Sequence, residues 1–333
     1  MMEQKNQLDL LNALRGIAAW MVCLFHASFL LKEFYPGLYH FFDIGQEGVY
    51  VFFVISGVVL PWSMDAGGYQ WKNADRFLLK RWIRLYPPFL VSVIICTFGF
   101  VGLKGFANPV ILHKMLHSVF FTAPFFGEKW INDVYWTLFV EFQFYIYLAL
   151  FFPLIAHKDR TVRTLALFGG LALALLSQFF TGRYVKLELF FHLPVFTLGY
   201  YLYLRLKGRI EDQEFWMGLV MTSVTALYIT GHLHGLSYRL ATVAIATALL
   251  IYFVRRKIPY LDALGEVSYS FYLTHWFVIS MANYWFYQYG KTPSGSLVVF
   301  VMIQVGAIAL AALFYRVVEK PSLRWTKKVK YRS

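Results

Sequence analysis

The chain has 333 residues, of which 59% are hydrophobic, 20% are aromatic and only 15% are charged. A soluble domain has about 25% charged residues, so this composition excludes an ordinary soluble domain and indicates a protein that crosses a membrane several times. The formal net charge is +13, and the two cysteines, Cys23 and Cys96, both lie in apolar segments. They provide neither a disulfide framework nor a CxxC metal or redox motif, and we expect both to be small packing residues.

Ten apolar stretches are each long enough, at about 17 to 25 residues, to cross a bilayer as a helix. They predict an all-α, polytopic helical membrane protein. We expect one transmembrane domain over residues 1–333, with a cytoplasmic amphipathic loop at 64–85 and a basic cytoplasmic tail at 317–333. The predicted spans are 8–31, 45–63, 86–103, 131–153, 164–181, 187–205, 214–231, 238–254, 263–288 and 296–316.

The distribution of lysine and arginine predicts the orientation in the membrane. If the N-terminus is cytoplasmic, 22 of the 31 basic residues fall in inner segments and 8 fall in outer segments. Because cytoplasmic segments are enriched in Lys and Arg, this bias places both termini in the cytoplasm. The positive charge is then explained by topology and by attraction to anionic lipid headgroups, so we expect membrane lipid and no nucleic acid as a partner.

The first span carries two ionisable residues, Arg15 and His26, in an otherwise apolar helix. Eleven residues separate them, which is close to three helical turns, so both lie on one face about 16 Å apart along the axis. Such groups cost several kcal/mol at membrane depth unless they face protein or water. Arg15 can also be explained by snorkelling to the near interface, whereas His26 lies too deep for that and indicates a functional site.

A basic, aromatic-rich helix is predicted within the 64–85 segment, capped by Asp75 and ended by Pro87 and Pro88. Its Arg81 and Arg84 are three residues apart and therefore neighbours on one face. Two interpretations fit this pair. The arginines bind lipid phosphates, or they hold a soluble, phosphorylated cofactor that arrives from the cytoplasm, since arginine forks suit phosphate groups.

Two further ionisable residues are expected near the middle of the membrane, Glu141 in the fourth span and His275 in the ninth. Together with His26 they could line one cavity, where Glu141 would pair with His26, His275 or Arg15. The alternative is that Glu141 and His275 only join helices through hydrogen bonds.

Polar residues near the outer span ends give weaker signals. Asp133, Glu188 and His192 are expected to be solvated or interfacial, and His232 with His234 is a weak metal signal, so we expect no metal.

Three functions fit these residues. The first is group transfer across the membrane, with a cationic entrance for a phosphorylated donor such as an acyl-CoA and a deeper imidazole that takes the proton of an acceptor hydroxyl. The second is a glycan or metabolite transporter with an intramembrane proton relay. The third is a structural subunit of a polysaccharide-export complex.

Six motifs in order resemble those of the membrane-bound acyltransferase 3 family, nearly from end to end of the chain. They are LDLLNALRGIAAWMVCLFHASF with Arg15 and His26, GVYVFFVISGVVL with Ser56 and Gly57, LLKRWIRLYPP with Arg81 and Arg84, YWTLFVEFQFY with Trp136 and Glu141, LGEVSYSFYLTHW with Ser268, Tyr269 and His275, and VVEKPSLRW with Glu319 and Pro321. Thr137 stands where the family commonly has Ser.

The resemblance implies an O-acyltransferase of the bacterial cytoplasmic membrane that moves an acyl group, with acetyl favoured, from acyl-CoA to a hydroxyl of a glycan or glycan precursor. It implies His26 as the catalytic base and Arg15 with Glu141 as residues that shape the catalytic site. Donor binding is implied for Arg81, Arg84 and Arg15, and substrate binding for His275, Ser268, Tyr269 and Trp136. Acyl-CoA, acetyl-CoA above all, is the expected co-substrate. Direct transfer and an acyl-enzyme intermediate both remain open.

Overall fold

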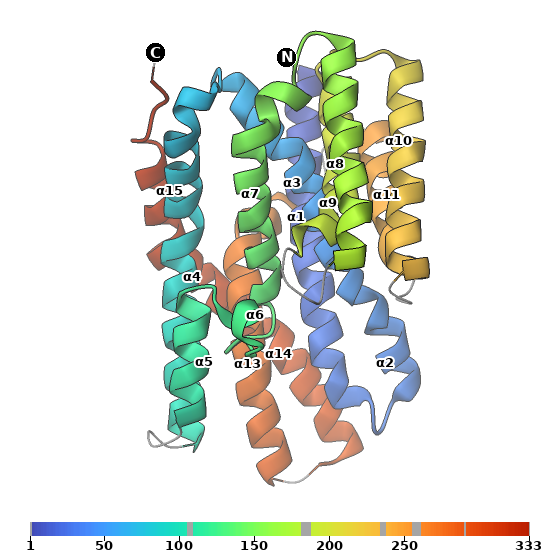
Figure 1. Cartoon of the computed structure of the whole chain (residues 1–333). Helices are drawn as coiled ribbons and strands as arrows, with labels where there is room; N and C mark the ends of the chain where they lie inside the picture. The colour runs from blue at the N-terminus through green and yellow to red at the C-terminus, as the bar shows by residue number, and fades with distance from the viewer. Residues whose placement is uncertain are drawn as a thin grey trace.

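The structure is a computed structural model that describes residues 2–104, 109–180, 188–233, 238–254, 261–289 and 291–332, and these residues form helices and no strands (Figure 1). The helices are α1 (Met2–Ser28), α2 (Pro36–Phe42), α3 (Gly48–Ala66), α4 (Ala74–Lys104), α5 (Pro109–Val119), α6 (Ala123–Phe126), α7 (Tyr135–Ile155), α8 (Arg160–Phe180), α9 (Leu189–Leu206), α10 (Asp212–Leu227), α11 (Arg239–Phe253), α12 (Asp262–Glu266), α13 (Ser268–Tyr289), α14 (Pro293–Phe314) and α15 (Lys320–Thr326).

Each of the ten predicted spans corresponds to a helix, which confirms a polytopic helical membrane protein. Six helical stretches of the described chain are long and apolar enough to cross a membrane, namely Leu10–Leu31, Pro36–Ala66, Trp71–Phe100, Tyr135–Ile155, Arg160–Gln178 and Pro293–Thr326. The other four predicted spans form α9, α10, α11 and α13. The two chain ends lie at the same end of the molecule, as the predicted topology requires (Figure 1).

The predicted helix break at Pro87 and Pro88 is wrong, because α4 continues through both prolines. A proline inside a helix leaves the carbonyl four residues earlier without its N–H partner, here the carbonyls of Ile83 and Arg84. The hydroxyl of Ser322 in α15 donates to both of these carbonyls. One hydroxyl from a distant part of the chain thus faces both carbonyls and shares its proton between them, which helps the helix to continue in an apolar environment.

The segments predicted as a cytoplasmic loop (64–85) and a basic tail (317–333) are largely helical. Residues 64–85 form the end of α3, a short 3₁₀ turn and the start of α4, and residues 315–326 form a π-helical turn followed by α15. Beyond α15 the chain is tied to the start of α4, since Arg332 bonds the side chains of Asn73 and Asp75. The basic C-terminal segment is thus packed on the domain along α4.

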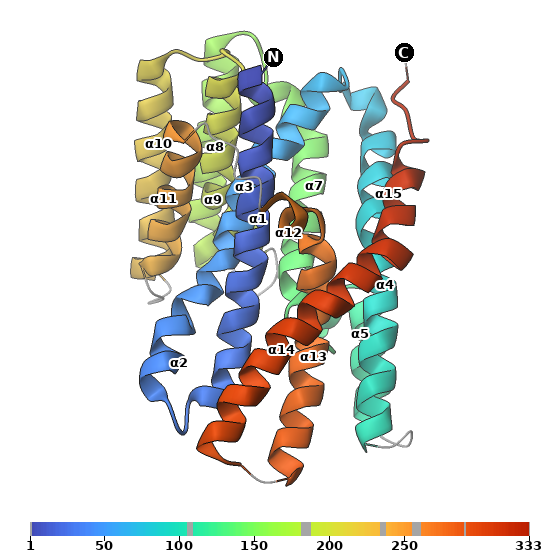
Figure 2. The ribbon, with the colours of Figure 1, turned by 180° about the vertical axis from the view of Figure 1, so that it is seen from behind.

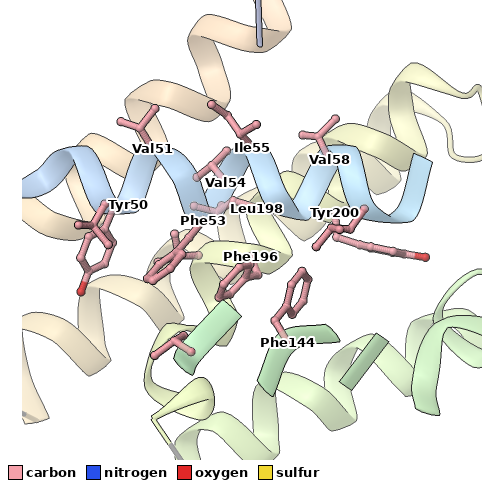
Figure 3. Packing of buried hydrophobic residues seen from close by; sticks show 14 of the residues in the cluster. Tyr50, Val51, Phe53, Val54, Ile55, Val58, Phe144, Phe196, Leu198 and Tyr200 are labelled. Carbon is pink, nitrogen blue, oxygen red and sulfur yellow. The ribbon is translucent and has the colours of Figure 1, made fainter. Parts of the chain in front are cut away.

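The core is organised around α3, whose buried side chains pack against α9 and α7 (Figure 3). At the crossing of α3 and α9, Gly57 faces the carbonyl of Phe196 and Gly199 faces the carbonyl of Val54, with no room for a Cβ on either glycine. Small residues of this kind let two helix backbones touch inside a membrane. The close crossing fixes α3 as the central wall of the domain.

Helix α1 lies against α3, α12, α13 and α14 (Figure 2). Gly16 of α1 meets the backbone of Leu264 and Gly265 in and around α12, again without space for a Cβ. This contact sets α1 and the following α13 side by side, so that the face carrying Arg15 and His26 points towards α13.

Candidate active site

Five of the predicted site residues line one cavity, which we call the arginine cavity. Residues from α1, α3, α4, α7 and α13 form its wall, and about 820 Å³ inside it, the open mouth included, is free of atoms. The predicted residues that line it are Arg15, Arg81, Arg84, Glu141 and Tyr269.

The arginine cavity holds three guanidinium groups and one carboxylate. Among the described residues, no carboxylate lies within 4.0 Å of a charged nitrogen of Arg15, Arg81 or Arg84. The Glu141 carboxylate instead accepts hydrogen bonds from the Tyr145 hydroxyl at 2.7 Å and the Ser56 hydroxyl at 3.5 Å. The cavity therefore has an excess of positive charge that is available for an anionic ligand.

Arg81 is held more firmly than the other two arginines. Its side chain is 6% exposed, its guanidinium donates to the Ser63 hydroxyl, and it lies over the rings of Phe77 and Tyr145. Such stacking on aromatic faces is a preferred environment for arginine. Arg81 therefore anchors one side of the cavity, while Arg15 and Arg84, which also line it, are half-buried.

His26 and Trp136 line a second cavity, which we call the histidine cavity and which encloses about 890 Å³ with its open mouth. Polar groups converge on it from several elements, including Gln46, Asp133 and His192. The Trp136 ring packs against the His192 ring with 5.5 Å between centroids. Two residues, Val49 and Tyr272, line both cavities and form the partition between them. The residues that line the histidine cavity are Val22, Phe25, His26, Gln46, Val49, Tyr50, Asp133, Val134, Trp136, Phe191, His192, Leu240 and Tyr272.

The His26 ring is fixed by a hydrogen bond to the fully buried His275. Nδ1 of His26 lies 3.1 Å from Nε2 of His275, and Nδ1 of His275 lies 3.1 Å from the carbonyl oxygen of Phe271. A carbonyl can only accept, so in the neutral pair Nδ1 of His275 carries the proton and its Nε2 accepts one from Nδ1 of His26. The remaining nitrogen of His26, Nε2, then keeps an unprotonated lone pair.

The arrangement differs from the sequence expectation in which His26, Glu141 and His275 line one cavity. Glu141 lies in the arginine cavity, His26 lies in the histidine cavity, and His275 lines neither because its side chain is buried behind His26. Ser268 is also fully buried and lines neither cavity. The position of a residue in a predicted span gives its depth in the membrane, but it does not show which neighbouring helix its side chain contacts.

Some residues of the two cavities were missed or placed differently by the sequence analysis. Tyr145 follows Glu141 by four residues and Asp133 precedes Trp136 by three, spacings that bring side chains to one face of a helix or turn. Asp133 and His192 were expected in solvated or interfacial roles, yet both line the histidine cavity. The side chains of His232 and His234 lie outside the described residues.

The known proteins that this chain resembles point to one family of acyltransferases. The family model described as an acyltransferase domain matches residues 8–316. The exopolysaccharide production protein ExoZ of Rhizobium meliloti is 33% identical, over 73% of this chain and 79% of the relative. The acyltransferase MdmB of Streptomyces mycarofaciens is 24% identical, over 96% of this chain and 92% of the relative, and the putative membrane-bound transacylase BcsY of Komagataeibacter xylinus is 25% identical, over 97% and 85%. No solved structure matches the chain. The chain belongs to the membrane-bound acyltransferase 3 family and is a membrane acyltransferase.

Proposed function

We propose that this membrane acyltransferase transfers an acyl group, most simply acetyl, from cytoplasmic acyl-CoA to a hydroxyl of a glycan or glycan precursor. One observation carries the proposal. Two cavities of different chemistry, one cationic and one polar and aromatic, share Val49 and Tyr272 in their walls, and the His26 imidazole lines the second cavity. The relative ExoZ is named as an exopolysaccharide production protein, which supports a carbohydrate acceptor.

The arginine cavity is suited to the donor. Phosphate groups of acyl-CoA match guanidinium forks, and none of the three arginines has a described carboxylate within ion-pair distance. Arg81 and Arg84 lie in the first part of α4, which begins at the end of the molecule where both termini lie (Figure 1). If the termini are cytoplasmic, in the inner membrane of a bacterium, the donor phosphates reach these arginines from the cytoplasm.

The histidine cavity is suited to the acceptor. A carboxylate at Asp133 and an amide at Gln46 can hydrogen-bond sugar hydroxyls, and the Trp136 ring offers a flat apolar face for the C–H side of a sugar. His26 lies eleven residues beyond Arg15 on α1, and therefore further from the N-terminal end of the molecule. An acceptor in this cavity would place a hydroxyl beside Nε2 of His26.

The proton transfers follow from the state of the imidazole. Nε2 of His26 removes the proton of the acceptor hydroxyl as its oxygen attacks the thioester carbonyl. The new C–O bond forms, the C–S bond breaks, and the proton passes from His26 to the departing CoA thiolate. The products are an ester and free CoA, and His26 returns to its starting state. His275 keeps the accepting nitrogen of His26 directed away from the buried side throughout.

The test compares wild type with His26→Ala, and uses His40→Ala, an exposed histidine of α2, as a matched control. Glycans from cells that carry each variant are analysed by mass spectrometry, and release of free CoA from acyl-CoA is measured on purified protein in lipid nanodiscs. We expect His26→Ala to lower the rate by about 10² to 10⁴-fold, the usual contribution of a general base, with no change in His40→Ala.

Two results would contradict the proposal. A folded, inserted His26→Ala protein that acylates at the wild-type rate would remove His26 as the base. Movement of the acceptor into vesicles without consumption of thioester would favour the transporter with a proton relay instead.

A further inference from the structure

Two imidazoles lie on one face of α5, at the end of the molecule opposite both termini (Figure 1). His113 and His117 are four residues apart and therefore adjacent on the helix surface. Their ring centroids are 4.5 Å apart, and the Glu128 carboxylate, which follows α6, reaches within 3.5 Å of Nδ1 of His113. One nitrogen of each histidine and one oxygen of Glu128 all lie within 4.8 Å of one another.

We propose that His113, His117 and Glu128 form a binding site for a divalent cation, with Zn²⁺ as the ion that best fits the donor set. Two histidine nitrogens and a carboxylate oxygen are ligands that Zn²⁺ binds at about 2.0 to 2.2 Å, commonly with water in the fourth position. The ligands of a tetrahedral ion with these bond lengths lie about 3.3 Å apart. The three groups must therefore approach by about 1.5 Å at most, which side-chain rotation allows because His113 is 56% exposed and Glu128 is 35% exposed.

The protonation of His117 favours a metal ligand. Nδ1 of His117 lies 2.9 Å from the hydroxyl oxygen of Thr122, and that hydroxyl donates to the backbone carbonyl of His117. When the hydroxyl donates to this carbonyl, 3.5 Å away, its oxygen accepts a hydrogen bond from Nδ1 of His117. Nε2 of His117 then has a free lone pair. A histidine whose second nitrogen is hydrogen-bonded in this way is the usual arrangement around a bound metal.

The backbone brings Glu128 back to α5 without the ion. The Glu128 N–H bonds the carbonyl of Ala123, Gly127 takes a left-handed conformation, and the Ile131 N–H bonds the Ser118 hydroxyl. In the segment between α5 and Glu128, Phe121 has a positive φ of 54°, a strained value for a residue with a side chain. Stacking of the Phe121 ring on Phe89 offsets the cost of this strain. The fold therefore already holds the backbone of Glu128 near α5, so ion binding would cost little free energy for ordering this backbone.

The two lysines next to the proposed ligands in the chain interact electrostatically with Asp133. Burial raises the pKa of the Asp133 carboxyl, and Lys114 and Lys129, the chain neighbours of the proposed ligands, lower it in part. Asp133 follows Glu128 by five residues and lines the histidine cavity. A bound cation would clamp α5 to the start of the segment between Glu128 and Asp133, as a structural site that does not depend on the proposed acyl transfer.

The test uses the full chain in lipid nanodiscs, without a polyhistidine tag and stripped of metal with a chelator. Zn²⁺ is titrated calorimetrically, and Co²⁺ absorbance reports the ligand geometry. We expect one saturable equivalent per chain in wild type and in the His40→Ala control. The affinity should fall more than tenfold in Glu128→Gln and the equivalent should be lost in the His113→Ala/His117→Ala double variant.

Thermal unfolding provides the second measurement. Saturating Zn²⁺ should raise the melting temperature of wild type and of His40→Ala, because an ion that binds only the folded chain stabilises it, and should leave the double variant unchanged. The proposal is overturned if wild type shows no saturable equivalent, or if the double variant binds Zn²⁺ with the same stoichiometry and affinity as wild type. Both readouts are independent of acyl transfer, so they stand apart from the proposed function.

Discussion

His26 and His275, 249 positions apart in the chain, are joined by a hydrogen bond of 3.1 Å between Nδ1 and Nε2. The bond has the geometry by which a catalytic triad orients its histidine, except that the orienting group here is a second imidazole rather than a carboxylate. Its own orientation comes from the Phe271 carbonyl one helical turn earlier on α13. The backbone of α13 thereby determines which nitrogen of His26 is free.

The first prediction follows from this chain of hydrogen bonds. His275→Leu should lower kcat by about 10²-fold, the lower end of the range for a general base, because His26 loses the acceptor that fixes its tautomer. The KM values for donor and acceptor should stay nearly constant. His275→Gln should recover part of kcat, since its amide oxygen can accept from Nδ1 of His26. Equal kcat values for the two variants, measured across the pH profile, would show that His275 only fills space.

Sequence reasoning identified the residues of this pair but not their relationship. The Arg15 and His26 spacing gave the shared helix face, and the expected depths of His26 and His275 were comparable. Which of Glu141, His275 and Arg15 would contact His26 depends on how α1, α7 and α13 are rotated against one another. That rotation is set by contacts such as Gly16 against Gly265, between residues far apart in the sequence.

The second prediction separates the two interpretations of the arginine pair. Arg84→Ala should raise the KM for acyl-CoA by about 10-fold or more, since a hydrogen bond to a charged group contributes about 1.5 to 3 kcal/mol, with little change in kcat. Lys80→Ala, one turn earlier on α4 and outside the arginine cavity, is the matched control for charge. An acyl-pantetheine donor without the nucleotide phosphates should show no difference between Arg84→Ala and wild type. If Arg84→Ala and Lys80→Ala behave alike, the arginine binds lipid rather than the donor.

The third prediction concerns the crossing of α3 and α9. Gly199→Ala places a Cβ against the Val54 carbonyl, so it should lower the free energy of unfolding by about 1 to 3 kcal/mol, the range typical of overpacking. Gly169→Ala in α8 is the control, because a Cβ there meets nothing within 4 Å, and it should be neutral or stabilising by up to about 1 kcal/mol. Thermal unfolding in detergent measures both. Equal melting temperatures would mean that the crossing can relax.

The same crossing shows where a motif stops being informative. Gly57 stands in the GVYVFFVISGVVL motif, and its lack of a side chain indicates close packing. Its partner Gly199 is 142 positions away, and nothing in the apolar sequence around Gly199 distinguishes it as the contact. The continuity of α4 through Pro87 and Pro88 is similar, because it depends on the Ser322 hydroxyl at the other end of the chain. Local patterns predict the helices, and these long-range contacts decide their continuity and rotation.

The last prediction concerns Asp133, which lines the histidine cavity just before α7 begins. Burial raises the pKa of its carboxyl, against the opposing effect of Lys114 and Lys129. The ionised carboxylate accepts hydrogen bonds from acceptor hydroxyls, so acceptor KM should rise as the pH falls through this raised pKa, at a higher pH than for an exposed aspartate. Asp133→Asn should raise acceptor KM about 10-fold at neutral pH, remove its acid dependence, and leave donor KM unchanged, the reverse of Arg84→Ala.

The stability of Asp133→Asn provides its control. Because the pKa of Asp133 is higher in the folded than in the unfolded chain, ionisation costs folding free energy as the pH rises between the two values. Replacement by asparagine removes that cost, so the melting temperature at neutral pH should not fall, and a change in acceptor KM cannot then be attributed to unfolding. Steady-state kinetics with each substrate varied in turn, from neutral to acidic pH, measures the effect. An unchanged acceptor KM in Asp133→Asn, or a rise in donor KM alone, would place the acceptor outside the histidine cavity.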